Sequence, residues 1–83
     1  MAVDKIKKRL IEHTESVTTS GSGSASLHNY PDGVAVSGRC TTQDAVVIPV
    51  QSQTGVPWVK VHNWDLTPVS NKTVTVVVTF ART

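Results

Sequence analysis

The chain has 83 residues, a mass of 8.9 kDa, a formal net charge of +2 and one cysteine, Cys40. A single domain of this size buries only about 60% of the surface that its unfolded chain exposes, so its core is thin. A lone cysteine excludes an intrachain disulfide, and three scattered histidines argue against a structural metal site, so we expect oligomerisation to supply additional stability.

The positive charge is concentrated near the N-terminus, where four basic residues lie within five positions (Lys5, Lys7, Lys8 and Arg9). Such a run attracts phosphate groups, but it is also typical of a solvated helix face. No aromatic residue alternates with these charges, so base stacking is unsupported. Nucleic-acid binding is therefore the third and weakest of the functions that we consider.

The N-terminal segment shows apolar spacings of three and four residues, the pattern of a coiled-coil seam. The predicted seam residues are Val3, Ile6, Leu10, His13 and Val17. This pattern predicts a helical oligomerisation arm over residues 1–17. Because so short a helix is marginal in isolation, it must pack on the rest of the chain or on other copies.

Residues 18–26, which read TTSGSGSAS, have the composition of a flexible or extended connector. We expect this linker to separate the arm from a β head over residues 27–83. In the head, residues 30–33 predict a β-turn, and residues 45–50 form an apolar strand in which Pro49 indicates an edge or a strand end.

Residues 73–80, TVTVVVTF, carry the strongest strand signal in the chain. One face is apolar throughout and the other holds Thr and Val, with no charge on either face. We expect a strand of this kind to lie centrally in the sheet or beneath another subunit. Its apolar face and two valines of an earlier strand make up the predicted core: Val59, Val61, Val74, Val76, Val78 and Phe80.

Residues 58–64 alternate as well, which places four large side chains on one face: Trp58, Lys60, His62 and Trp64. Aromatic rings flanked by polar groups form platforms for sugars or anchors for protein partners. The competing interpretation is that the two tryptophans fill the core or a subunit interface. Both interpretations stay open at this point.

No catalytic motif accompanies the histidines, serines and Cys40, and we predict a non-enzymatic protein with no catalytic, cofactor or metal site. Cys40 is expected to be a structural thiol. The predicted fold is mainly β with an N-terminal α-helix: a short helical, coiled-coil-like arm followed by a small antiparallel β-sandwich or barrel head.

A helical stem, a Gly/Ser/Thr connector and a Val/Thr-rich head that ends in WVKVHNWDLTPVSNKTVTVVVTF together resemble small bacteriophage fibre or appendage proteins, of the tail-fibre, head-fibre or decoration type. The resemblance implies a trimer and a place in the virion, with other virion proteins or a host-surface glycan as further partners. It transfers no site residue.

These observations lead us to expect a trimeric virion structural subunit that presents a β head for attachment or assembly, with loops 51–57 and 65–71 as contact surfaces. The alternative is a monomeric carbohydrate- or protein-binding β-sandwich with the helix folded across its sheet. The sequence shows no bilayer-spanning apolar run and no signal-peptide pattern. We therefore expect synthesis in the host cytoplasm without membrane insertion.

Overall fold

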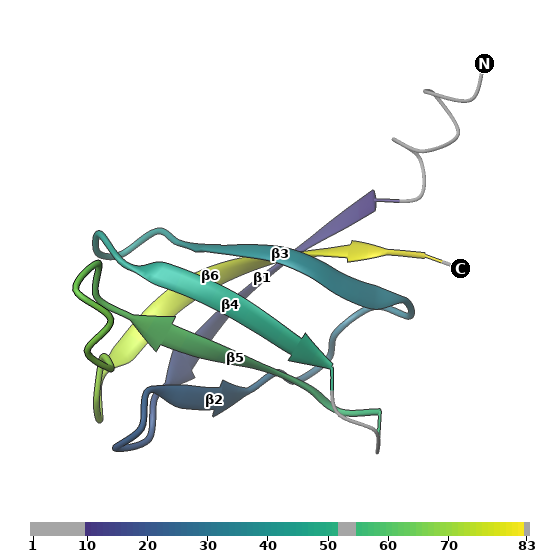
Figure 1. Cartoon of the computed structure of the whole chain (residues 1–83). Helices are drawn as coiled ribbons and strands as arrows, with labels where there is room; N and C mark the ends of the chain where they lie inside the picture. Colours follow the sequence, from purple (N-terminus) through teal and green to yellow (C-terminus); the bar gives the residue numbers. More distant parts are fainter. Residues whose placement is uncertain (1–9, 52–54, 83) are drawn as a thin grey trace.

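The computed structural model describes residues 10–51 and 55–82, and within these ranges the protein is all β (Figure 1). Every pairing between its strands is antiparallel. The six strands are β1 (Leu10–Thr18), β2 (Ser24–Ser26), β3 (Val34–Cys40), β4 (Val46–Gln51), β5 (Pro57–His62) and β6 (Thr73–Ala81).

The strands form one sheet in the order β1-β6-β3-β4-β5-β2. The sheet curls into a half-barrel, so its two edge strands, β1 and β2, approach each other where the chain turns from one into the other (Figure 1). Away from that turn the two edges diverge. The half-barrel therefore has a concave inner face that holds the core and a convex outer face.

Strand β6 lies between β1 and β3, in agreement with the prediction of a central strand. Its alternation explains the core directly, because successive side chains of a strand point to opposite faces. The inward residues Val76, Val78 and Phe80 are fully buried, as are Val59 and Val61 of β5. The complete buried hydrophobic cluster is Val17, Ala25, Leu27, Val47, Val59, Val61, Val69, Val74, Val76, Val78 and Phe80.

The predicted helical arm is wrong where the structure describes it, because Leu10–Thr18 is β1 and pairs with β6 along its whole length. In a strand, Leu10 lies on the outer face, while His13 and Val17 lie on the inner face. These three residues therefore form no common seam. The other two predicted seam residues, Val3 and Ile6, lie outside the described residues.

Residues 10–18 form a strand because pairing with β6 lets their inner side chains join the core next to those of β6. Ile11 lies opposite Phe80, and Val17 lies opposite Val74. A pairing along the whole strand outweighs the weak helical preference of a Thr- and Val-containing segment. The predicted sandwich is also wrong, because the head is one curled sheet that includes both β1 and β2.

The segment between β1 and β2 is held by hydrogen bonds to residues 70–72. Thr19, which is buried, accepts a bond from the Lys72 N–H at 3.0 Å, and its own N–H donates to the Lys72 carbonyl at 2.9 Å. Gly23 has a φ of 80°, and a Cβ there would lie 2.6 Å from the Val61 carbonyl oxygen. The turn thus requires glycine at this position.

Pro49 lies inside β4, which is flanked by β3 and β5 and is not an edge strand. The pairs that join β3 to β4 are Gly38 with Val47 and Arg39 with Val46, so Pro49 lies beyond this short ladder. A register shift between Ala35 and Ser37 bulges β3 at this place. A proline is tolerated where the ladder ends, because it has no N–H to donate.

Candidate functional site

The outer face of β5 presents three of the four residues predicted to share a surface: Trp58, Lys60 and His62. They face outward because Pro57, Val59 and Val61, which alternate with them, are buried. The Lys60 ammonium lies 5.5 Å from the centre of the Trp58 ring, within the range of a cation–π contact. Trp58 is therefore a half-buried ring on the sheet surface and not a core residue.

The fourth residue, Trp64, lies apart from this group, in the turn that follows β5. Its side chain is 69% exposed, and its indole N–H donates a 2.7 Å hydrogen bond to Asp44. In the same turn, the Asp65 carboxylate accepts bonds from the Thr67 hydroxyl and N–H, which lower its pKa. The structure thus separates the two tryptophans that the alternation placed together.

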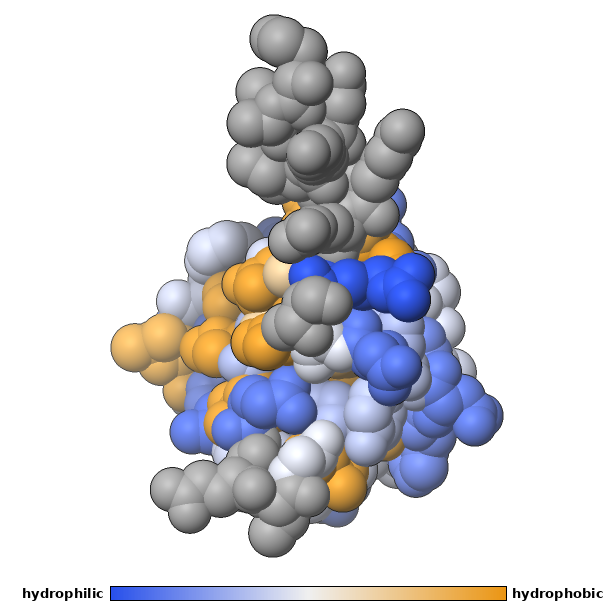
Figure 2. All heavy atoms as spheres, turned by 90° about the vertical axis from the view of Figure 1, so that its right-hand side faces the viewer, coloured by the Kyte–Doolittle hydropathy of each residue, from blue (hydrophilic) through white to orange (hydrophobic). Residues whose placement is uncertain are grey.

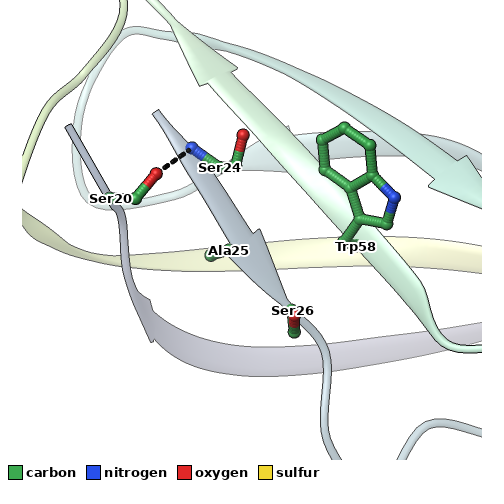
Figure 3. A pocket seen from close by; sticks show the side chains of 5 residues that line it. All are labelled: Ser20, Ser24, Ala25, Ser26 and Trp58. Carbon is green, nitrogen blue, oxygen red and sulfur yellow. Dashed lines mark hydrogen bonds between the residues drawn. The ribbon is translucent and has the colours of Figure 1, made fainter. Parts of the chain in front are cut away.

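A hollow of about 370 Å³ lies beside Trp58 (Figure 3). Strand β2 and the turn before it supply the other lining residues, since β2 pairs with β5 and places Ser26 beside Trp58 on the sheet surface. The lining residues are Ser20, Ser24, Ala25, Ser26 and Trp58. The alternating pattern of residues 58–64 indicated the ring, but nothing in the sequence indicated the serines, because a strand of only three small residues gives no hydrophobic signal.

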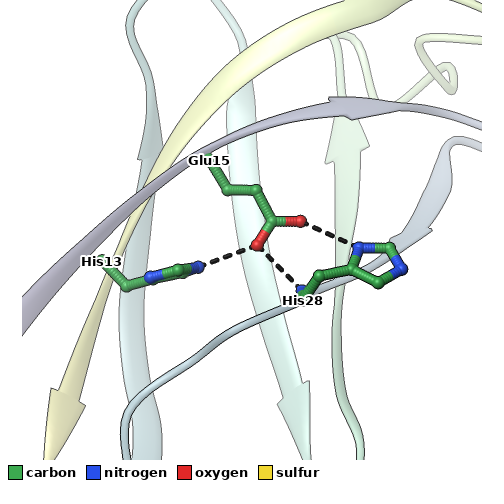
Figure 4. Close-up of polar contacts among 3 residues, drawn as sticks. All are labelled: His13, Glu15 and His28. Carbon is green, nitrogen blue, oxygen red and sulfur yellow. Dashed lines mark hydrogen bonds and ion pairs between the residues drawn. The ribbon is translucent and has the colours of Figure 1, made fainter.

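On the opposite edge of β2, a second hollow of about 310 Å³ separates β2 from β1. It ends at a polar cluster that joins the diverging edges (Figure 4), formed by His13 and Glu15 of β1 and by His28, which follows β2. One Glu15 oxygen lies 2.8 Å from His13 Nε2 and accepts a 2.8 Å bond from the His28 N–H. The other oxygen lies 3.1 Å from His28 Nδ1.

The environment of Glu15 favours its charged form. Burial opposes ionisation, but the hydrogen bonds from His13 and from the His28 backbone and ring, with the charge interaction with His13, outweigh it and lower the Glu15 pKa. His13, the predicted seam residue, instead packs edge-on against Phe80, and Tyr30 stacks on the same ring. The cluster thus closes the open side of the half-barrel above an aromatic core.

Several large apolar side chains remain exposed on the outer face, at the end of the sheet where β1 and β3 begin and β4 ends. We call them the outer apolar band: Leu10, Val34, Val36, Ile48 and Val56, each 43–53% exposed. Leu10 and Val34 both pair with Ala81, which makes one continuous row across β1, β6 and β3. Figure 2 shows hydrophobic atoms gathered mainly on one half of this end of the molecule.

The described residues contain no group of three or more His, Cys, Asp and Glu side chains arranged to hold a metal ion. Cys40 is half-buried and lies opposite Val76 on β6. Within the ranges that the structure covers there is also no helix of the length and hydrophobicity that a membrane crossing needs.

Comparison with known proteins gives no relative. No protein-family model, curated protein or solved structure matches this chain.

Proposed function

We propose that the protein is a non-enzymatic structural subunit that assembles with copies of itself through the outer apolar band, as a small fibre or decoration protein of a virion. The observation that carries this proposal is the band itself. Large contiguous apolar patches are uncommon on the surface of a monomer, and they are typical of interaction sites.

The charge distribution on the outer face also supports assembly. Arg39 is the only charged residue on the outward positions of β3, β4 and β6. It is paired with Glu12 of β1 at 2.8 Å, and this ion pair spans β6 beside Val77, which is only 6% exposed. Charged side chains keep a protein surface solvated and are depleted at the centre of protein interfaces. The outward positions of β3, β4 and β6 therefore carry no charge besides the paired Arg39.

The virion assignment and the choice of three copies are supported by the resemblance of the Val/Thr-rich segment at residues 58–80 to phage fibre and appendage proteins. The helical stem that was part of this resemblance no longer contributes, because Leu10–Thr18 is strand β1. In this proposal the copies therefore contact one another through the outer apolar band and not through a helical seam. Hydrophobic burial at the interface supplements the thin core of a small domain.

The test is the solution mass of the full chain at micromolar concentration, measured by light scattering coupled to gel filtration. We expect three times the chain mass of 8.9 kDa for the natural sequence. An antibody raised against the chain should label intact phage particles in electron micrographs. Failure to label particles would remove the virion assignment but leave self-assembly in place.

A further inference from the structure

We propose that the hollow over the paired strands β2 and β5 binds a neutral saccharide, with the Trp58 ring as its stacking platform and the serine hydroxyls of β2 and of the turn before it as its hydrogen-bonding groups (Figure 3). This inference goes beyond structural assembly. Its lining residues are not members of the outer apolar band, although they adjoin it, because Ile48 of the band lies opposite Lys60 in the β4–β5 register.

The platform follows from the alternation of β5. Because Pro57 and Val59 point into the core, Trp58 is held on the outer face with its ring half-buried. A flat aromatic ring that is fixed in place and partly open to solvent can cover the apolar C–H face of a sugar ring. Trp64 lacks such a setting, because it is 69% exposed in a turn.

The serines of β2 and of the turn before it supply hydroxyl groups in a fixed arrangement. Ser20 Oγ accepts a 3.3 Å bond from the Ser24 N–H, and it lies 3.0 Å from Ser22 Oγ. Ser26 lies directly opposite Trp58 in the β2–β5 register. Each hydroxyl can both donate and accept, as a polyhydroxylated ligand requires.

The charges around the hollow define the ligand class. None of its lining residues is charged. The Lys60 ammonium contacts the Trp58 ring and so disfavours a cationic ligand. One lysine does not favour the binding of a phosphate-rich polymer such as a nucleic acid, because that binding requires several cationic side chains.

The size of the hollow is also appropriate. Its volume of about 370 Å³ lies at the small end of the range for ligand pockets and suits a mono- or disaccharide. Because the hollow is open, we expect a weak site, with a Kd on the order of 1 mM.

The experiment is a titration of the full chain with methyl β-glucoside, methyl β-galactoside and the methyl glycoside of N-acetylglucosamine. In a Trp64→Phe background Trp58 is the only tryptophan, so its fluorescence reports on the hollow. We expect a saturable change with at least one of these sugars. Methyl glucuronide is the charged comparison, and binding of it more than tenfold tighter would contradict a neutral ligand.

Saturation-transfer NMR of the bound sugar then compares variants. Trp58→Ala should weaken binding at least tenfold, and Ser26→Val should weaken it severalfold while suiting a strand position. Trp64→Phe is the matched aromatic control and should leave affinity unchanged. If Trp58→Ala does not fold, judged by circular dichroism, Ser26→Val and Ser24→Val decide the question.

The proposal is overturned if the folded natural chain binds none of the three sugars saturably. It is also overturned if the folded Trp58→Ala, Ser24→Val and Ser26→Val variants bind sugar as tightly as the natural chain does. The mass of each sample is measured in parallel. A monomer that binds sugar refutes assembly alone, and a trimer that binds none refutes the saccharide site alone.

Discussion

Leu66 adopts a backbone conformation that residues with a Cβ rarely occupy. Its φ is 72°, and its side chain is 76% exposed in the turn after β5. The left-handed conformation costs a residue of this kind about 1–2 kcal/mol, and no buried contact offsets that cost here. Asn29 and Asn71 also have positive φ, but asparagine tolerates it better.

Replacing Leu66 by glycine should therefore stabilise the protein by about 1 kcal/mol, because glycine adopts positive φ without strain. Urea unfolding monitored by circular dichroism measures this change. Leu66→Ala is the matched control, since it removes the side chain but keeps the Cβ, and it should leave stability nearly unchanged. Equal stabilisation by both variants would show that side-chain exposure, not backbone strain, is responsible.

Gly23 is the opposite case at the same scale. A Cβ at this position would meet the Val61 carbonyl oxygen at 2.6 Å, and φ is 80°. Gly23→Ala should cost about 1–3 kcal/mol, because strain and a displaced turn add together. Gly21, with open space around its Cα and no positive φ, is the control, and Gly21→Ala should be tolerated. Unchanged thermal stability of Gly23→Ala would contradict the close approach of the turn to β5.

At the scale of elements, the open side of the half-barrel depends on Glu15, which joins β1 to the segment after β2. Its folded pKa lies below the ordinary value of 4.5, so the folded state binds fewer protons than the unfolded chain. The stabilisation is thus complete above about pH 4.5 and is lost as the pH falls through the lowered pKa.

We expect Glu15→Gln to be less stable than the natural chain at pH 7 and to lose less stability on acidification. Urea midpoints at pH 7, 5 and 3 measure the difference, which should shrink towards pH 3. Glu12→Gln is the control, since Glu12 is an exposed carboxylate paired with Arg39 on the outer face. A gap between Glu15→Gln and the natural chain that stays constant with pH would contradict the role of the charge.

The elements also show how far the sequence could be interpreted. Strands β5 and β6 were predictable because each alternates cleanly between buried valines and outward residues. In β1 the inward positions are Ile11, His13, Glu15 and Val17. Because two of these are polar, the alternation of apolar and polar residues that identifies a strand is not visible in the sequence. The apolar residues that remain happen to match helical spacing.

The candidate site was accessible only in part for a related reason. The alternation placed Trp58 and Lys60 on one face of the strand but left open whether that face is core or surface; in the structure both lie on the outer face. It could not separate Trp64, because a turn after His62 ends the strand. The Gly/Ser composition of this stretch also could not predict that Ser24 and Ser26 pair with β5, because that pairing depends on the curl of the whole sheet.

At the scale of the whole molecule, the outer apolar band should be the contact between copies. Ile48→Lys and Val36→Lys each place a charge in the band, and both sites are about half exposed, so the fold itself should tolerate them. Leu66→Lys is the matched control, because Leu66 is exposed but lies in the turn after β5, outside the band. We expect the two band variants, but not the control, to dissociate the assembly to single chains at micromolar concentration. Analytical ultracentrifugation distinguishes these outcomes.

The most direct test of self-assembly is the solution mass of the 83-residue chain with its natural sequence, measured by light scattering. Assembly through the band predicts a stable species of three times 8.9 kDa at micromolar concentration. A single species of 8.9 kDa under the same conditions would contradict it.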